Sequence, residues 1–263
     1  MIRTNNPALS ANAFARPQTW ADAFGSAAPQ ARPKTMTLQG TVNTTLLLLA
    51  ICAACAVATW AWIEPQIEVG QLSPTALAIL AGGGIFGFLI SMVMHFKPKI
   101  SPILAPIYAA AQGAFVGAVS LVYHARFGGA IVLIAVMLTF GILAALLLAY
   151  KTRLIKPTEN FKLGITAATG GLCFLWIATI VLNLFGLQIP YLYSMGPIGI
   201  GFAAFVVVIA ALNLVLDFDF IEQGSQNQLP RYMQWYAAHG LLVTLVWLYV
   251  SLLRLLSLVS GRD

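Results

Sequence analysis

Three carboxylates stand at the end of the apolar stretch LNLVLDFDFIEQG, residues 212–224. They are Asp217, Asp219 and Glu222, in a chain whose 263 residues include only 8 acidic ones. Carboxylates in apolar surroundings can exchange a proton or attract a cation. At about 100° per residue, Asp217 and Asp219 point to opposite sides of a helix, whereas Asp219 and Glu222 share a side. We therefore predict that Asp217 faces the protein interior and that the other two lie at the aqueous rim.

The composition places these residues in a membrane protein. Sixty per cent of the chain is hydrophobic, 8% is charged and the mean hydropathy is +0.86, whereas soluble domains contain about 25% charged residues. Apolar runs near the ~20 residues that cross a hydrocarbon core recur along the chain. We predict an all-α, polytopic membrane protein with seven transmembrane helices in one bundle, at about 42–63, 73–95, 103–124, 128–150, 163–186, 197–217 and 236–258.

The beginning of the chain differs from the rest in composition. It is rich in Ala, Asn, Pro and Arg and contains no apolar core of signal-peptide length. We predict a flexible polar tail at residues 1–40 and a transmembrane domain at residues 41–263.

The distribution of basic residues predicts the orientation, because Lys and Arg accumulate on the cytoplasmic side. With a cytoplasmic N-terminus, only Arg126, Arg254 and Arg262 lie outside. Inside lie eleven: Arg3, Arg16, Arg32, Lys34, Lys97, Lys99, Lys151, Arg153, Lys156, Lys162 and Arg231. We predict a cytoplasmic N-terminus and an external C-terminus. The net charge of +6 then reflects topology, and nucleic acid is not an expected partner.

This orientation brings ionisable residues of three helices to one membrane depth. Asp217 ends the sixth apolar run, His95 ends the second, and His239 lies about one turn into the seventh. Asn213 precedes Asp217 by one turn on the same side. Because an ionisable residue inside a membrane is a functional candidate by default, we predict that Asp217 responds to protons. The alternative is that each residue only marks the boundary with water.

Other patterns favour packing over catalysis. The chain contains no GxSxG, HExxH, P-loop or dinucleotide motif, so we do not expect an enzyme. Cys52 and Cys55 form a CxxC inside an apolar run and are interpreted as packing residues. Gly83 and Gly87 form a GxxxG, which predicts a close helix contact. We expect no cofactor beyond a transient calcium ion, and the sequence does not identify metal ligands.

Four strings resemble the Bax inhibitor/YccA-like family, also called the transmembrane BAX inhibitor motif family, and its bacterial branch in particular. They are MTLQGTVNTTLLLL (36–49), SPILAPIYAAAQGAFVG (101–117), LDFDFIEQG (216–224) and QWYAAHGLLVTLVWLYVSLLRLL (234–256). The resemblance implies seven membrane helices, a bacterial inner membrane and a pH-sensitive calcium leak. In those channels two aspartates, one on the sixth helix and one on the seventh, share a proton. They also form an ionic latch with an arginine of the second helix.

The resemblance assigns roles to positions of this chain and shows where it departs from the family. The first aspartate falls on Asp217, the second on Thr244 and the arginine on His95, while the family's acidic residue in YAAAEG is Gln112. A shared-proton pair cannot form at these positions, and a titratable histidine replaces a permanent cation. The implied pH sensor and gate are Asp217 and His95. The implied lining of a polar path comprises Asn213, Gln112, Thr244 and His239.

Two functions stay open at this point. The first is a proton-gated calcium leak, with the lipid bilayer, protons and calcium ions as its partners. The alternative is a non-conducting regulator that binds a membrane protease or stress-response partner through its tail. Deleting residues 1–35 separates them, because a leak persists without the tail and a tail-docked regulator loses its partner.

Overall fold

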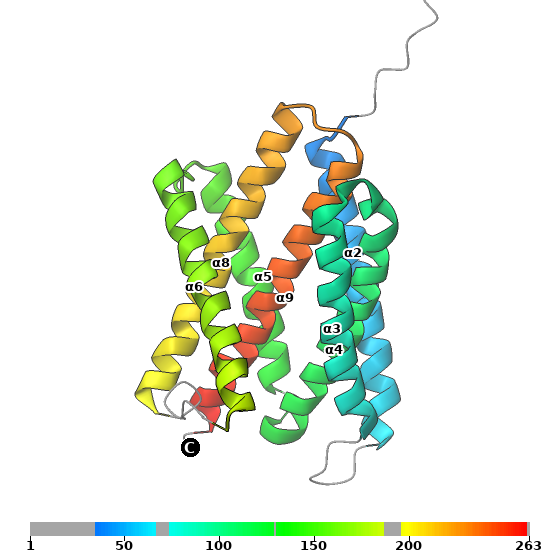
Figure 1. Ribbon diagram of the computed structural model, residues 1–263, viewed down its shortest axis with the longest axis vertical. Coiled ribbons are helices and arrows are strands. Elements are labelled where there is room, and N and C mark those ends of the chain that lie inside the picture. The colour runs from blue at the N-terminus through cyan, green and yellow to red at the C-terminus, as the bar shows by residue number, and fades with distance from the viewer. Residues whose placement is uncertain (1–34, 67–73, 129, 187–195, 262–263) are drawn as a thin grey trace, which may run out of the picture. The chain divides into compact units, whose positions relative to one another are not determined.

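The computed structural model describes residues 35–66, 74–128, 130–186 and 196–261 (Figure 1). Seven helices in these residues are long and apolar enough to cross a membrane, which confirms the predicted fold class. They are α2 (Leu38–Ile63), α3 (Pro74–Phe96), α4 (Ser101–Phe127), α5 (Ala130–Lys151), α6 (Glu159–Leu184), α8 (Pro197–Gln226) and α9 (Tyr232–Ser260). Two 3₁₀ turns, η3 (Glu64–Gln66) and η4 (Pro98–Ile100), follow α2 and precede α4. The predicted tail falls almost wholly outside the described residues and stays a prediction.

Local signals fix where several helices begin and end. The Thr37 hydroxyl caps α2 by accepting a hydrogen bond from the Gly40 amide at 3.0 Å, and Thr158 caps α6 in the same way. Pro197 is the first residue of α8, where a missing amide hydrogen costs nothing. Gly128 ends α4 with a φ of 85°, a conformation that glycine adopts without steric cost.

α9 is the central helix of the bundle. In its most apolar window 61% of the residues are buried inside the protein, compared with 17% for α2, α3, α5 and α6. It packs against α2, α4, α5 and α8, while α3 packs on α4 and α6 packs on α8 (Figure 1). Residues carried by α9, or by the faces turned toward it, are therefore those shielded from lipid.

Two pairs of glycines bring helices close together. Gly83 and Gly87 of α3 face α4, and a Cβ atom on Gly83 would lie 3.1 Å from the Cβ of Phe115. The predicted GxxxG contact is therefore present. A tighter pair, Gly113 and Gly117 of α4, faces the backbone of α2, where a Cβ atom on Gly117 would lie 3.0 Å from the Cα of Ala56. This pair also has GxxxG spacing in the sequence, but no helix contact was predicted from it.

A short segment before α2, Thr35–Thr37, ties that helix to the loop between α8 and α9. The Met36 amide donates to the Leu229 carbonyl oxygen at 2.6 Å, and Gln234 Nε2 of α9 donates to the Thr37 hydroxyl at 3.2 Å. The Met36 side chain is buried in the cluster that contains Phe218 and Ala237. This segment thus packs against the end of the bundle at which α2 begins. We call this end the α2-start end.

Candidate functional site

Asp217 is the central residue of the candidate site. It lies in the last three turns of α8 and faces α9, with its Oδ1 atom 3.8 Å from the place a Cβ atom on Gly240 would take. Its Oδ2 atom is buried, and no described residue gives it a hydrogen bond. A buried polar atom without a partner is uncommon and costly. The α8–α9 interface therefore holds a carboxylate oxygen that the protein itself does not satisfy.

Thr244 is the residue that the structure brings to Asp217. It is buried on α9, one turn after Gly240, and its hydroxyl lies beside the Asp217 carboxyl group. The hydroxyl donates to the Gly240 carbonyl oxygen at 3.2 Å and also lies within hydrogen-bonding reach of the Asp217 carboxyl group. The position that the resemblance assigned to a second aspartate is thus next to the first. With threonine there, the interface carries one carboxyl group.

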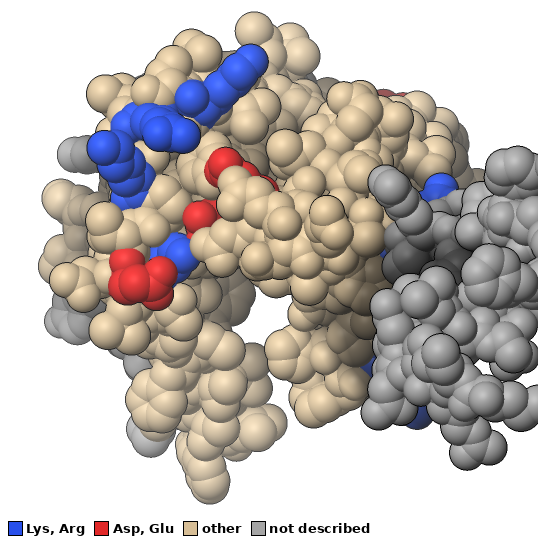
Figure 2. Space-filling view, turned by 90° about the horizontal axis from the view of Figure 1, so that it is seen from above, with Lys and Arg blue, Asp and Glu red and all other residues tan. Residues whose placement is uncertain are grey.

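The other two carboxylates of α8 have partners from neighbouring helices. Asp219 forms an ion pair with Lys162 of α6, with Oδ2 and Nζ 2.8 Å apart. Glu222 accepts a hydrogen bond from the Tyr150 hydroxyl of α5. Figure 2, which views the α2-start end, shows acidic and basic side chains gathered over one side of the bundle. These two carboxylates tie α8 to α5 and α6, and their predicted position at the aqueous rim stays a prediction.

His95 lies at the end of α3 and is exposed. Its Nδ1 atom is 3.4 Å from the Tyr236 hydroxyl of α9, and its ring meets Phe96 edge-on with centroids 5.8 Å apart. Within the described part of the chain, no hydrogen bond or ion pair joins His95 to Asp217. The predicted latch would require His95 to leave Tyr236, and it stays a prediction.

His239 is the second ionisable side chain buried between helices. It is 5% exposed, and its ring lies edge-on to Tyr108 of α4 with centroids 4.4 Å apart. Its Nε2 atom has no hydrogen-bond partner among residues 35–66, 74–128, 130–186 and 196–261. Because His239 faces α4 and the adjacent Gly240 faces Asp217, the two ionisable groups lie on different sides of α9.

The remaining predicted path residues occupy other helix interfaces. Asn213 Nδ2 donates to the Thr169 hydroxyl of α6 at 2.8 Å, so this amide serves the contact between α6 and α8. Gln112 of α4 faces Gly87 of α3, where a Cβ atom would lie 2.6 Å from its Oε1 atom. The structure therefore brings Asp217 and Thr244 together, while Asn213, Gln112 and His239 each lie at a different interface.

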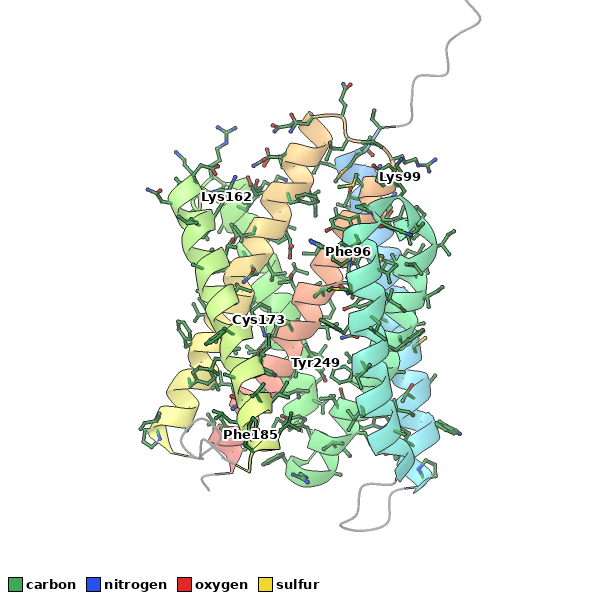
Figure 3. All side chains as sticks on the ribbon, in the orientation of Figure 1. Phe96, Lys99, Lys162, Cys173, Phe185 and Tyr249 are labelled. Carbon is green, nitrogen blue, oxygen red and sulfur yellow. The ribbon has the colours of Figure 1, made fainter. Side chains whose placement is uncertain are left out.

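Several polar groups at this end were missed by the sequence analysis. The hydroxyl groups of Thr45 in α2 and Ser101 in α4 are buried without a partner in the described structure. Neither Lys162 nor Tyr150 was predicted as a site residue. Figure 3 shows Lys162 near the α2-start end of α6. Lys162 stands one residue before the fifth predicted span and Asp219 two residues after the sixth, and opposite charges at neighbouring span ends are the signal that could have found this pair.

No group of three or more His, Cys, Asp and Glu side chains that could hold a metal ion occurs in the described ranges. Cys52, Cys55 and Cys173 are free thiols, and Cys52 is packed in the core as interpreted.

Comparison with known proteins gives one finding. The family model described as Bax inhibitor 1 like matches residues 6–261, nearly the whole chain. The search of curated proteins found no significant match, and neither did the search of solved structures.

Proposed function

Because the chain belongs to the Bax inhibitor 1 like family and crosses a membrane with seven helices, we propose that it is a proton-gated calcium leak with Asp217 as its sensor. The observation that carries this proposal is the buried Oδ2 atom of Asp217, which has no partner in the described residues. The resemblance to the bacterial branch supports a bacterial inner membrane as the location of the proposed leak.

The proposal follows from what can satisfy a buried carboxylate. A charge inside a membrane must be paired, hydrogen-bonded or neutralised. The ionisable groups around Asp217 are engaged elsewhere or face away: Lys162 binds Asp219, Tyr150 binds Glu222, His95 contacts Tyr236, and His239 packs on Tyr108. A proton and a cation can each neutralise the Asp217 carboxylate, and they compete for the same oxygen.

Calcium suits this competition because it is a hard cation that prefers oxygen ligands. Only one carboxyl group and the Thr244 hydroxyl are offered at the α8–α9 interface. Such a donor set favours brief contact during passage over storage of the ion. Protonation removes the negative charge and leaves a neutral group between α8 and α9. The charge state of Asp217 thus controls both the attraction for the ion and the packing of the two helices.

The test is calcium flux into liposomes containing the full chain, measured from acidic to alkaline buffers. Asp217→Asn is permanently neutral, so its flux should be independent of pH and equal to the wild-type flux at the acidic end. Asp219→Asn is the matched control, because Asp219 lies two residues away and is paired with Lys162 at the rim. It should retain the pH dependence, because the substitution leaves the Asp217 carboxyl group unchanged.

The outcomes separate the alternatives. Unchanged pH dependence in Asp217→Asn would reject Asp217 as the sensor. Loss of pH dependence in both variants would show that the pH response also depends on the Asp219–Lys162 pair at the rim. Absence of flux in the wild-type protein, with the protein folded in the liposomes, would favour a non-conducting regulator.

A further inference from the structure

A large apolar groove lies between α2 and α5, on the side of α9 away from Asp217. Its volume is about 480 Å³, within the ~300–1,000 Å³ typical of ligand sites. Ala53 and Ala56 of α2 line one wall, Val136 and Phe140 of α5 line the other, and Tyr249 of α9 lies in its floor. The two alanines leave the space open because a methyl group does not reach across to α5. We call this space the α2–α5 groove.

The hydroxyl groups that line the α2–α5 groove form hydrogen bonds within its own walls. The hydroxyl groups of Ser120 and Tyr249 bond to each other at 2.7 Å (Tyr249 is labelled in Figure 3). The Thr139 hydroxyl donates to the Ala135 carbonyl oxygen at 2.7 Å. No charged residue lines the groove. The walls therefore bind an occupant mainly through dispersion contacts and the burial of apolar surface.

The groove lies at membrane depth and opens toward the lipid. All of its lining residues belong to membrane-spanning helices, and Val57 and Phe140 are 69% and 50% exposed. Trp60 lines its end nearest the C-terminus of α2 and meets His124 edge-on, with ring centroids 5.0 Å apart. Tryptophan marks the boundary between hydrocarbon and headgroups in many membrane proteins. The groove thus begins at one leaflet's headgroup level and runs toward the bilayer centre.

Size decides between a partner helix and a lipid chain. A helix with its side chains is ~10–12 Å in diameter, so 480 Å³ would hold only about one turn of it. An acyl chain is much thinner, so a much longer stretch of it fits in the same volume. We propose that the α2–α5 groove binds one acyl chain of a bilayer phospholipid, which enters from the leaflet where α2 ends. The headgroup then lies at the level of Trp60 and His124.

The test uses the full chain in vesicles of phosphatidylcholine that carries a diazirine in the middle of one acyl chain. After illumination, labelled peptides are identified by mass spectrometry. Labelling should concentrate on residues 53–60 and 132–140, above that of other exposed apolar positions such as Phe88 of α3 and Phe174 of α6. Equal labelling of the groove and of these positions would overturn the proposal.

Ala53→Phe fills the groove and should lower its labelling about fivefold, because the ring takes the volume of the chain. Ala54→Phe is the matched control, since Ala54 is exposed on the same helix and does not line the groove. Val136→Phe fills the space from the opposite wall, so a folding defect of one variant does not leave the proposal untested. Labelling that survives both filling variants contradicts the proposal.

The position of the diazirine tests the direction of entry. A group near the ester end should label residues close to Trp60, and a group near the terminal methyl should label residues close to Leu49 and Leu242, deeper in the groove. The reverse order would show that the chain enters from the other leaflet and would overturn that part of the proposal.

Discussion

At the scale of single residues, three carboxylates within six positions of α8 have three different environments. Asp219 is paired with Lys162, and Glu222 accepts from Tyr150. Asp217 faces α9, where its Oδ2 atom receives no hydrogen bond from any described residue. Paired rim carboxylates stabilise helix contacts. An unpaired carboxyl group between two helices is instead sensitive to whichever proton or ion reaches it.

His95 provides a prediction at this scale. If it leaves Tyr236 to latch onto Asp217, the latch is present only while the imidazole is charged. An imidazole carries a positive charge only when it is protonated, whereas the arginine guanidinium is permanently charged. His95→Arg should therefore preserve a latch at alkaline pH that the wild type loses, and the two flux curves should separate there.

His95→Ala is the control for that measurement, because it leaves the carboxyl group without a latch at every pH. Calcium flux against pH is recorded for the wild type and both variants. Three superimposable curves would show that His95 is an interface residue whose contact is Tyr236.

At the scale of helices, the contact between α2 and α4 depends on Gly113 and Gly117. A Cβ atom on Gly113 would lie 2.8 Å from the Cβ of Cys55 and closer still to the Cys52 carbonyl oxygen, which belongs to backbone that cannot rotate away. Gly113→Ala should therefore separate the two helices and lower the free energy of unfolding by about 1–3 kcal/mol.

Thermal or denaturant unfolding of the full chain in detergent measures this effect. Gly141→Ala is the matched control, because a Cβ atom on Gly141 of α5 meets nothing within 4 Å. The control should change the free energy of unfolding by no more than about 1 kcal/mol. Equal effects of the two substitutions would show that the close approach of α2 and α4 does not contribute to stability.

At the scale of the whole molecule, hydropathy predicted the seven helices but not their ends. The sixth apolar run was predicted to stop at Asp217, yet α8 continues to Gln226. Hydropathy reports the part of a helix inside hydrocarbon, whereas backbone hydrogen bonding continues into water. The additional turns carry Asp219 and Glu222, whose partners on α5 and α6 hold them in place.

The candidate site was predictable only in part, for a related reason. Helical geometry predicted that Asp217 and Asp219 point apart, and the resemblance placed Thr244 opposite Asp217. The rotation of each helix about its own axis depends on packing, and no sequence period encodes it for helices that are apolar on all sides. For this reason the interfaces occupied by Asn213, Gln112 and His239 became known only from the structure.

The orientation of the bundle in the membrane gives the last prediction. At the α2-start end the described residues carry Lys97, Lys99, Lys151, Arg153, Lys156, Lys162 and Arg231, and at the other end Arg126 and Arg254. Figure 3 shows Lys99 and Lys162 at that same end.

Since basic residues remain in the cytoplasm, the α2-start end should be cytoplasmic. A reporter that is active only outside the cytoplasm should then work when fused after Asp263, and should fail when inserted at Arg153, between α5 and α6. The opposite pattern would show that the bundle has the opposite orientation in the membrane. Failure at both positions would place both on the cytoplasmic side, and because seven crossings cannot do that, one of the seven helices would have to lie along the membrane instead of across it.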